Sequence, residues 1–262
     1  MSSPGICAET HGVIWQISGN PGNNMDRLIK GSSELNQMFA ALNRTAAGLR
    51  RDFGEVENLQ QSIKGARDFV SKAATRIEES IISDLTLVRP SAGILTPNLS
   101  RDGDGRDEFV LALSGAPNFV RGNPHFAISL ALRSNDETKI AMVYSPIGER
   151  LYYAEVDNGA FVFSTYHSTR IRVSEKKNEK DVMVGYDSPT TIRQSPIATG
   201  NIRITGCPAL DIVWVAAGKF DAFVSQPLDY AEICAGELIV AEAMGKITEQ
   251  DGLMIVLNDN IM

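Results

Sequence analysis

The stretch GAPNFVRGNPHFAISLAL occupies residues 115–132. Its second half is mostly apolar and predicts a β-strand over residues 126–133. A compact apolar run at 109–113 precedes this stretch and predicts a buried strand. Three more short apolar segments follow, each after a turn sequence, and they predict strands at 139–144, 150–155 and 160–163. This succession of short strands predicts an antiparallel meander in the middle of the chain.

Two long amphipathic segments precede these strands. Residues 35–53 place apolar side chains at steps of three and four, which predicts a helix that ends at Gly54. Residues 62–68 are polar and predict a turn. Residues 69–87 repeat the apolar spacing and predict a second long helix, which Pro90 ends.

Helices and strands alternate after the meander. The patterns predict helices at 210–218 and 233–244, and strands at 181–185, 201–204, 222–224, 246–248 and 253–257. Helices, then a strand-rich block, then alternating elements predict layers of helix and sheet, an α+β or mixed α/β fold.

The chain is expected to form one domain after a short extension. Residues 1–24 contain glycines and prolines with few periodic apolar positions, and we expect them to be a poorly ordered extension. The domain then covers residues 25–262. Its N-terminal α+β half is expected at about 25–165 and its C-terminal α/β half at about 166–262.

The composition indicates a folded, acidic protein. Of the 262 residues, 43% are hydrophobic and 22% are charged, and the formal net charge is −7. Such a chain has no general attraction to nucleic acid or to anionic lipid. No apolar run reaches the about 18 residues of a membrane span, and the first residues do not resemble a secretory signal. We therefore expect a cytoplasmic protein with no membrane association and no direct nucleic-acid binding.

The three cysteines, Cys7, Cys207 and Cys234, are widely spaced and form no CxxC pair. This spacing argues against a disulfide framework and against a zinc site. We expect reduced thiols.

Several segments, read in order, resemble the inositol monophosphatase superfamily. Residues 115–132 resemble the family pattern GTTNF followed by HGxPxF, an apolar run and AL. The other matching segments are KGARDFVS at 64–71, VYSPIGERLYYAEVDNGAFV at 143–162, IRVS at 171–174, RITGCPALDIVWVAAGKFD at 203–221 and AGELIVAEAMG at 235–245. The resemblance covers about residues 35–257.

This resemblance implies a layered α-β-α-β-α sandwich of the inositol monophosphatase and sugar phosphatase type, usually found as a homodimer. It also implies hydrolysis of phosphate monoesters with bound Mg²⁺, which polarises the phosphate and neutralises developing charge. The family holds these ions with carboxylates from a GEE segment, a DPxDGT segment and a WDxAAG segment, as a hard cation requires oxygen ligands.

The matching positions of this chain have lost most of these carboxylates. With Gly115 as the anchor, the two aspartates of the DPxDGT segment fall on Leu111 and Ser114, and its first threonine falls on Ala116. The ligating glutamate of the GEE segment falls on Pro97. A leucine offers no lone pair to a metal ion, and a serine hydroxyl is a poor replacement for a carboxylate.

The segment that begins with KGARDFVS and the WD segment complete the site that the resemblance implies. Asp68 and Ser71 are kept, but the aspartate that helps to orient the attacking water falls on Ala74. Glu232 takes the place of the aspartate of the WD segment and is the one family metal ligand that remains. We therefore assign no catalytic residue, and we interpret the other positions as vestigial.

Four residues match positions that contact substrate in the family: Gly115, Gly206, Cys207 and Ser225. Cys207 replaces the serine of the GSAAL turn, and Ser225 replaces a glutamate. At a helix N-terminus the Cys207 thiol has either a lowered pKa or an inert, buried place, and we favour the second. His125 is interpreted as a structural loop residue rather than a base.

An acidic loop offers an alternative metal site. It resembles a calcium loop but lacks the glutamate that should follow at the required spacing, so we favour a solvated acidic turn. Its carboxylates belong to Asp102, Asp104, Asp107 and Glu108.

These substitutions favour a family member with absent or weak phosphatase activity that acts by binding a ligand or a partner, as the extragenic-suppressor branch of the family does with the transcription machinery. The alternative is a Mg²⁺-dependent phosphatase with a modified metal site, acting on inositol phosphate or another small sugar or nucleotide monophosphate. A third hypothesis is phosphate binding without catalysis at the Cys207 turn. Whether the chain is an enzyme stays open, and Mg²⁺ is expected only if activity remains. The expected partners are a second copy of the chain, another protein and a small phosphorylated ligand.

Overall fold

The computed structural model describes residues 29–59, 63–164, 167–176, 182–197 and 201–258. Side chains are not described for residues 57–74 or for Arg101. The predicted extension over residues 1–24 lies outside the described ranges. Within those ranges, no helix combines the length and the apolar character that crossing a bilayer requires.

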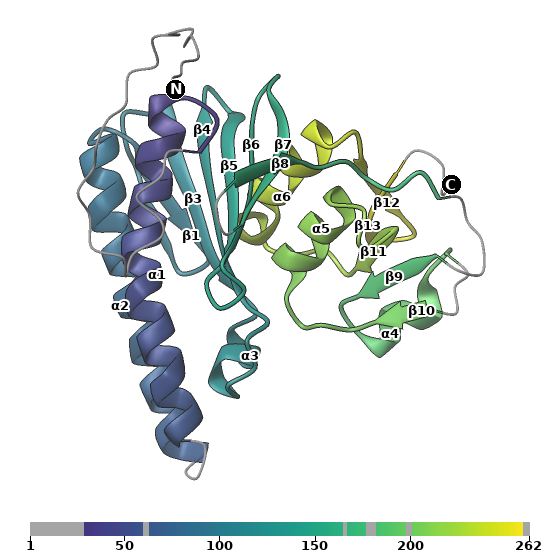
Figure 1. Cartoon of the computed structure of the whole chain (residues 1–262), viewed down its shortest axis with the longest axis horizontal. Coiled ribbons are helices and arrows are strands. Elements are labelled where there is room, and N and C mark those ends of the chain that lie inside the picture. The colour runs from purple at the N-terminus through teal and green to yellow at the C-terminus, as the bar shows by residue number, and fades with distance from the viewer. Residues whose placement is uncertain (1–28, 60–62, 165–166, 177–181, 198–200, 259–262) are drawn as a thin grey trace, which may run out of the picture.

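Two long helices, α1 (Ser33–Leu59) and α2 (Ile63–Val88), lie side by side against one face of the larger sheet (Figure 1). Both helices are longer than the apolar spacing predicted. Helix α1 continues past Gly54, and helix α2 begins before Asp68. The predicted helix end at Gly54 and the turn over 63–68 are therefore wrong. A glycine inside a helix costs about 1 kcal/mol, and the buried side chains of Phe53 and Val56 on either side of Gly54 offset that cost.

The larger sheet has eight strands in the order β2-β1-β3-β4-β5-β6-β7-β8. From β3 to β8 each strand pairs antiparallel with the next, which confirms the predicted meander, whereas β1 pairs parallel with β3. The strand bounds are β1 (Gly93–Thr96), β2 (Leu99–Arg101), β3 (Asp107–Ser114), β4 (Ala127–Ser134), β5 (Glu137–Ser145), β6 (Arg150–Glu155), β7 (Gly159–Ser164) and β8 (His167–Arg170).

Both faces of this sheet are covered, and strand β4 shows how. Ile128 and Leu130 belong to the core beneath α1 and α2, while Ala127 and Ala131 belong to the core on the opposite face. Successive side chains of a strand point to opposite faces, and burial of both faces makes the run almost continuously apolar. The small alanine side chains let helix α6 (Tyr230–Glu242) lie close on its face of the sheet.

A second sheet lies beyond α6, with five strands in the order β10-β9-β11-β13-β12. Helices α5 (Pro208–Ala216) and α6 lie between the two sheets, and α4 (Pro189–Gln194) lies against the outer face of the second sheet (Figure 1). These layers form the α-β-α-β-α sandwich that the resemblance implied. The strand bounds are β9 (Met183–Tyr186), β10 (Asn201–Arg203), β11 (Ala222–Ser225), β12 (Lys246–Gln250) and β13 (Leu253–Leu257).

Candidate functional site

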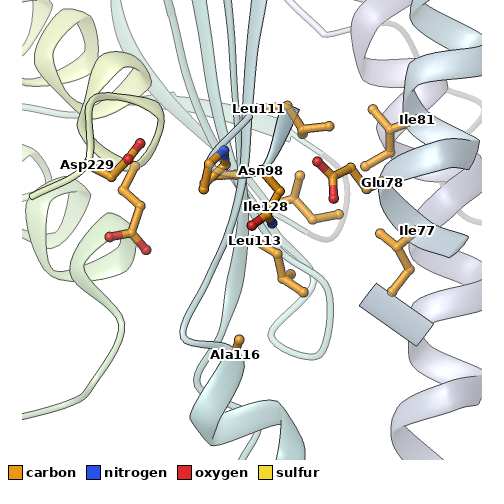
Figure 2. A pocket seen from close by; sticks show the side chains of 12 residues that line it. Ile77, Glu78, Ile81, Asn98, Leu111, Leu113, Ala116, Ile128 and Asp229 are labelled. Atoms are coloured by element: carbon orange, nitrogen blue, oxygen red, sulfur yellow. The ribbon is translucent and has the colours of Figure 1, made fainter. Parts of the chain in front are cut away.

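A cleft of about 290 Å³ lies where the C-terminal end of β3 meets α2 on one side and the first turn of α6 on the other. Ala116, the first residue of the short helix α3 (Ala116–Val120), also lines the cleft and lies at the bottom of the view in Figure 2. The residues that line it are Ile77, Glu78, Ile81, Pro97, Asn98, Leu111, Ala112, Leu113, Ala116, Ile128, Asp229 and Glu232. Figure 2 shows Glu78 on the α2 side and Asp229 on the opposite side, with apolar side chains of the sheet between them.

Leu111 lies on the floor of this cleft. It is 3% exposed and pairs with Leu130 of β4. The neighbouring lining side chains of Ile81 and Ile128 are also branched and apolar. At the position where the resemblance places a shared metal ligand, this chain therefore has a hydrocarbon surface.

Ser114, the last residue of β3, is fully buried and joins the sheet to both helices behind it. Its hydroxyl oxygen accepts a hydrogen bond from the backbone N–H of Ala209, at the start of α5, at 3.2 Å. Its hydroxyl group donates to the carboxylate of Glu232, in the first turn of α6. The Ser114 hydroxyl therefore links β3 to α5 and to α6 through these two hydrogen bonds.

Glu232 is half-buried at the edge of the cleft. Burial raises the pKa of its carboxyl group most, the negative charge of Asp229 raises it further, and the hydrogen bond from Ser114 lowers it. Asp229 is exposed and caps α6, because its Oδ1 accepts the backbone N–H of Ala231 at 2.9 Å. The two carboxylates therefore form one acidic end of the cleft.

Glu78 forms the other acidic end. Its Oε1 atom is buried and has no hydrogen-bond partner among the described residues. The sequence pattern did not single out Glu78 as a site residue. It lies four positions after Ala74 in α2, and residues four apart share one face of a helix, so the spacing itself was the available signal.

The structure brings part of the predicted vestigial site together. Pro97, Leu111 and Ala116 line the cleft with Glu232, and Ser114 contacts Glu232. Asp68, Ser71 and Ala74 lie in α2 but outside the residues whose side chains are described, so their predicted places in the site stay predictions.

The four predicted substrate-contacting residues, Gly115, Gly206, Cys207 and Ser225, are absent from the described lining of the cleft. Gly115 joins β3 to α3 with a φ of 80° in the left-handed region, and a Cβ atom there would lie 2.9 Å from the carbonyl oxygen of His125. Ser225 is buried at the end of β11. The geometry assigns a packing role to both.

Cys207 precedes α5 and is fully buried. Burial raises the pKa of its thiol to about 12, and the thiol donates to the carbonyl oxygen of Ser114 at 3.5 Å. Of the two alternatives that the sequence left open, the structure favours the inert thiol.

The backbone N–H groups at the turn before α5 donate their hydrogen bonds to acceptors within the protein. The N–H groups of Leu210 and Asp211 donate to the carbonyl oxygen of Cys207, each at 3.1 Å, and the N–H of Cys207 donates to the Thr205 hydroxyl at 3.2 Å. Ala209 donates to Ser114, as described above. The turn also holds the buried carboxyl group of Asp211, an arrangement that disfavours an anion at this helix end.

His125 lies in the loop after α3, and its structural role stays a prediction, because its buried Nε2 atom has no hydrogen-bond partner among the described residues. Its ring meets the edge of Trp214 with 4.9 Å between centroids, and burial lowers the pKa of its imidazole. Asn118 holds this loop against the turn before α5, because its Nδ2 donates to the carbonyl oxygens of His125 at 2.7 Å and Thr205 at 2.9 Å.

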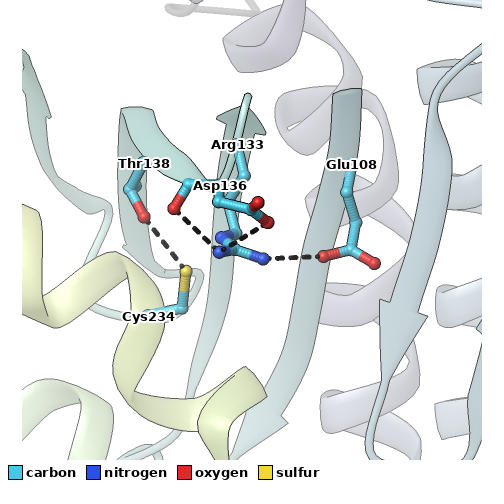
Figure 3. Close-up of polar contacts among 5 residues, drawn as sticks. All are labelled: Glu108, Arg133, Asp136, Thr138 and Cys234. Carbon is cyan, nitrogen blue, oxygen red and sulfur yellow. Dashed lines mark hydrogen bonds and ion pairs between the residues drawn. The ribbon is translucent and has the colours of Figure 1, made fainter. Parts of the chain in front are cut away.

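The acidic loop is engaged in other contacts. Figure 3 shows Arg133 between Glu108 and Asp136, with Nη1 donating to Glu108 at 3.2 Å and Nη2 to the backbone oxygen of Asp136 at 2.9 Å. Arg89 pairs with Asp107 at 2.7 Å, and Asp104 accepts the backbone N–H of Arg106 at 3.0 Å. Asp102 and Asp104 are exposed, as expected for a solvated acidic turn, whereas Asp107 is buried beside Arg89, so the prediction of solvation is wrong for Asp107.

The cleft does not fit a Mg²⁺ ion well. Among the described residues, no three Asp, Glu, His or Cys side chains come close enough to hold a metal ion. Figure 2 shows Asp229 and Glu78 on opposite sides of the cleft with Leu111 between them, and Glu232 lies in the first turn of α6, which Asp229 caps. Mg²⁺ requires about six oxygen ligands at about 2.1 Å, which this donor set does not supply.

The chain matches known proteins over most of its length. A sequence model described as the inositol monophosphatase family matches residues 12–261. An inositol-1-monophosphatase from Rhizobium meliloti (strain 1021) is 36% identical over 235 residues, covering 84% of this chain and 87% of that protein. A Nus factor SuhB from Pasteurella multocida (strain Pm70) is 29% identical over 233 residues, covering 83% and 85%. The crystal structure of extragenic suppressor protein suhB from Bartonella henselae has a TM-score of 0.77 at 30% identity, covering 88% of this chain and 95% of that one.

Proposed function

The chain belongs to the inositol monophosphatase family, and we propose that it keeps the family scaffold as a binding protein that does not hydrolyse phosphate monoesters. The observation that carries this proposal is the buried Leu111 on the floor of the cleft. Metal ions supply several kcal/mol of transition-state stabilisation in this kind of chemistry, and a hydrocarbon side chain at the shared ligand position removes the means of binding them.

The charge of the cleft supports the same conclusion. Its described lining has three carboxylates, those of Glu78, Asp229 and Glu232, and no basic side chain. A phosphate monoester carries between one and two negative charges at neutral pH, so without a cation the cleft repels it. This repulsion argues against a small phosphorylated ligand in the cleft.

The biological role is therefore proposed to be binding of another kind of ligand or of a partner protein. The Pasteurella multocida relative is named a Nus factor rather than a phosphatase, which supports this proposal. Assembly as a homodimer and a cytoplasmic location belong to the same proposal, and both follow from the resemblance and the acidic, globular composition rather than from the cleft.

The rival function is a Mg²⁺-dependent phosphatase with a modified metal site, acting on inositol phosphate or another small sugar or nucleotide monophosphate. It would rely on Glu232 and Asp229 for one weakly held ion. The Ser114 hydroxyl already occupies part of the hydrogen-bonding capacity of Glu232, which is why we favour the non-catalytic function.

A paired assay separates the two functions. We expect no Mg²⁺-dependent release of phosphate from inositol 1-phosphate above the rate without protein, while the Rhizobium meliloti relative provides the comparison rate in the same buffer. The matched control is Glu232→Gln, because a trace activity that this variant retains comes from a contaminating phosphatase. A rate comparable to that of the relative, lost in Glu232→Gln, would overturn the proposal.

A further inference from the structure

A second hollow, of about 700 Å³, lies against α5 at the place where β5 ends and β6 begins. Its described lining shares no residue with that of the cleft, and it includes Arg150 and Lys219 but no Asp or Glu. Such a lining is unexpected in a chain with a net charge of −7. We call this hollow, formed around Ser145, Arg150, Tyr152, Trp214 and Lys219, the cationic hollow.

The ammonium group of Lys219 is held in place by the residues around it. Its Nζ atom donates to the Tyr152 hydroxyl at 2.5 Å, and it lies 5.1 Å from the ring centroid of Tyr152 and 5.3 Å from that of Trp214. Tyr152 is itself 1% exposed, so its hydroxyl is a fixed acceptor. Ordering a lysine side chain on binding is costly, and here the free protein already orders this one.

Arg150 lies on the same face of β6 as Tyr152, because residues two apart in a strand share a face, with their Cα atoms about 7 Å apart. On the neighbouring strand Arg150 pairs with Ser145, which also lines the hollow. The Arg150 side chain has no hydrogen bond or ion pair among the described residues, and Lys219 has no carboxylate partner there. Both cations therefore keep donors for a ligand.

A phosphate monoester matches these two cations. It carries between one and two negative charges at neutral pH, and a guanidinium group can donate two parallel hydrogen bonds to it. The half-buried ring of Trp214, beside Lys219, offers an aromatic surface next to that phosphate. The volume of about 700 Å³ lies within the range of about 300–1,000 Å³ that small-molecule sites occupy.

We propose that the cationic hollow binds a small organic phosphate that carries an aromatic ring, such as a nucleoside monophosphate. The phosphate lies between Arg150 and Lys219, and the ring lies against Trp214. The proposal goes beyond the proposed function and does not depend on it, because it uses no residue of the cleft and requires no statement about Mg²⁺.

Fluorescence titration with Trp214 as the reporter tests this proposal. The substitution Trp15→Phe leaves Trp214 as the one tryptophan of the full-length chain. The probe is adenosine monophosphate (AMP), with adenosine and ribose 5-phosphate as matched controls that lack the charge and the base. A chelator is present throughout. We expect a saturable change of emission with AMP, and an affinity for AMP about tenfold or more above that for either control. Tenfold corresponds to about 1.4 kcal/mol, the size of one charge-assisted hydrogen bond or one base-stacking contact.

Two variants in the same background locate the phosphate. We expect Arg150→Gln and Lys219→Gln each to lose about tenfold in affinity for AMP and to leave the weak affinity for adenosine unchanged, because only the phosphate uses these cations. The control is Arg193→Gln in α4, which removes the same charge from an exposed position outside the hollow and should leave the affinity for AMP unchanged. Thermal melts identify any variant that fails to fold.

Four results would overturn the proposal. The first three are equal affinities for AMP and adenosine, unchanged AMP affinity in folded Arg150→Gln and Lys219→Gln, and an equal loss in Arg193→Gln, which would indicate attraction to basic side chains in general. The fourth is a Trp214 emission that changes with protein concentration but not with AMP, because a second copy of the chain would then cover the hollow. None of these results bears on phosphatase activity, so the proposed function stands or fails separately.

Discussion

The Ser114 hydroxyl donates a hydrogen bond to the carboxylate of Glu232, across the junction of β3 and α6. The family resemblance places two metal-binding carboxylates at these two positions. Here a neutral donor and one carboxylate satisfy each other directly, so their contact requires no cation. On the proposed function, this bond takes the place of a bridge through a metal ion.

Loss of the Ser114 hydroxyl should destabilise the fold. In Ser114→Ala, the backbone N–H of Ala209 and the Glu232 carboxylate both lose a buried partner, and we expect a decrease of about 1–3 kcal/mol in the free energy of unfolding, measured by urea denaturation. Ser129→Ala is the matched control. Its hydroxyl is equally buried but has no hydrogen-bond partner among the described residues, so we expect a change within about 0.5 kcal/mol. Equal losses in the two variants would contradict this account of Ser114.

Restoring the missing carboxylates should create a metal site at the expense of stability. In Leu111→Asp, a charge enters an apolar, buried position, and we expect the free energy of unfolding to fall by about 3 kcal/mol or more. In the triple variant Pro97→Glu, Leu111→Asp, Ser114→Asp, we expect Mg²⁺ to raise the melting temperature, because the ion compensates the clustered charges. If Mg²⁺ leaves the melting temperature of the triple variant unchanged, the missing carboxylates are not what separates this cleft from a metal site.

Asp211 should make stability depend on pH. Burial raises the pKa of its carboxyl group to about 7, although the Thr205 hydroxyl, 2.8 Å and 2.6 Å from its two oxygens, lowers it. The unfolded value is about 3.9, so between these pH values the folded state binds more protons than the unfolded state. The contribution of Asp211 to the free energy of unfolding is therefore fully present below about pH 4, and it is lost as the pH rises through about 7.

Asp211→Asn isolates this effect. As the pH rises from about 4 to about 7, we expect the wild-type protein to lose up to about 4 kcal/mol of unfolding free energy relative to the variant, since each pKa unit corresponds to about 1.36 kcal/mol. Urea denaturation at a series of pH values measures the difference. Parallel pH profiles for the two proteins would show that Asp211 keeps an ordinary pKa.

The buried thiols should be unreactive in the folded protein. Burial raises the pKa of Cys207 to about 12 and raises the pKa of Cys234, which also contacts the Thr138 hydroxyl at 3.4 Å (Figure 3). The thiolate is the reactive form, so in Cys7→Ser we expect negligible reaction with an aromatic disulfide reagent until urea unfolds the chain. Rapid labelling of Cys207 in the folded protein, located by mass spectrometry, would reinstate the reactive-thiol hypothesis.

The fold was largely predictable because its strands carry clear local signals. Strand β6 (Arg150–Glu155) and strand β13 (Leu253–Leu257) have the bounds that the apolar runs predicted. The missed elements lack such signals. Strand β8 (His167–Arg170) is polar and lies at the edge of its sheet, and α3 has only five residues, too few for a helical period.

The cleft was predictable only where the resemblance supplied a register. Counting from Gly115 identified Leu111 and Ser114 as positions of the family's metal ligands. In the structure, Leu111 lines the cleft and Ser114 lies behind it, against the start of α5. Glu78 and Asp229 were missed for different physical reasons. Glu78 resembles an ordinary polar residue of an amphipathic helix, and Asp229 resembles a helix cap, a role that it also fills. Only tertiary packing brings them to one cavity.

The most direct test of the central claim is a crystal of the wild-type protein soaked in Mn²⁺, which shares the oxygen ligands of Mg²⁺ and is visible by anomalous scattering. We predict no anomalous peak within coordination distance of Glu232 or above Leu111. A peak ligated by Glu232 and Asp229 would contradict the claim that this cleft has lost its metal.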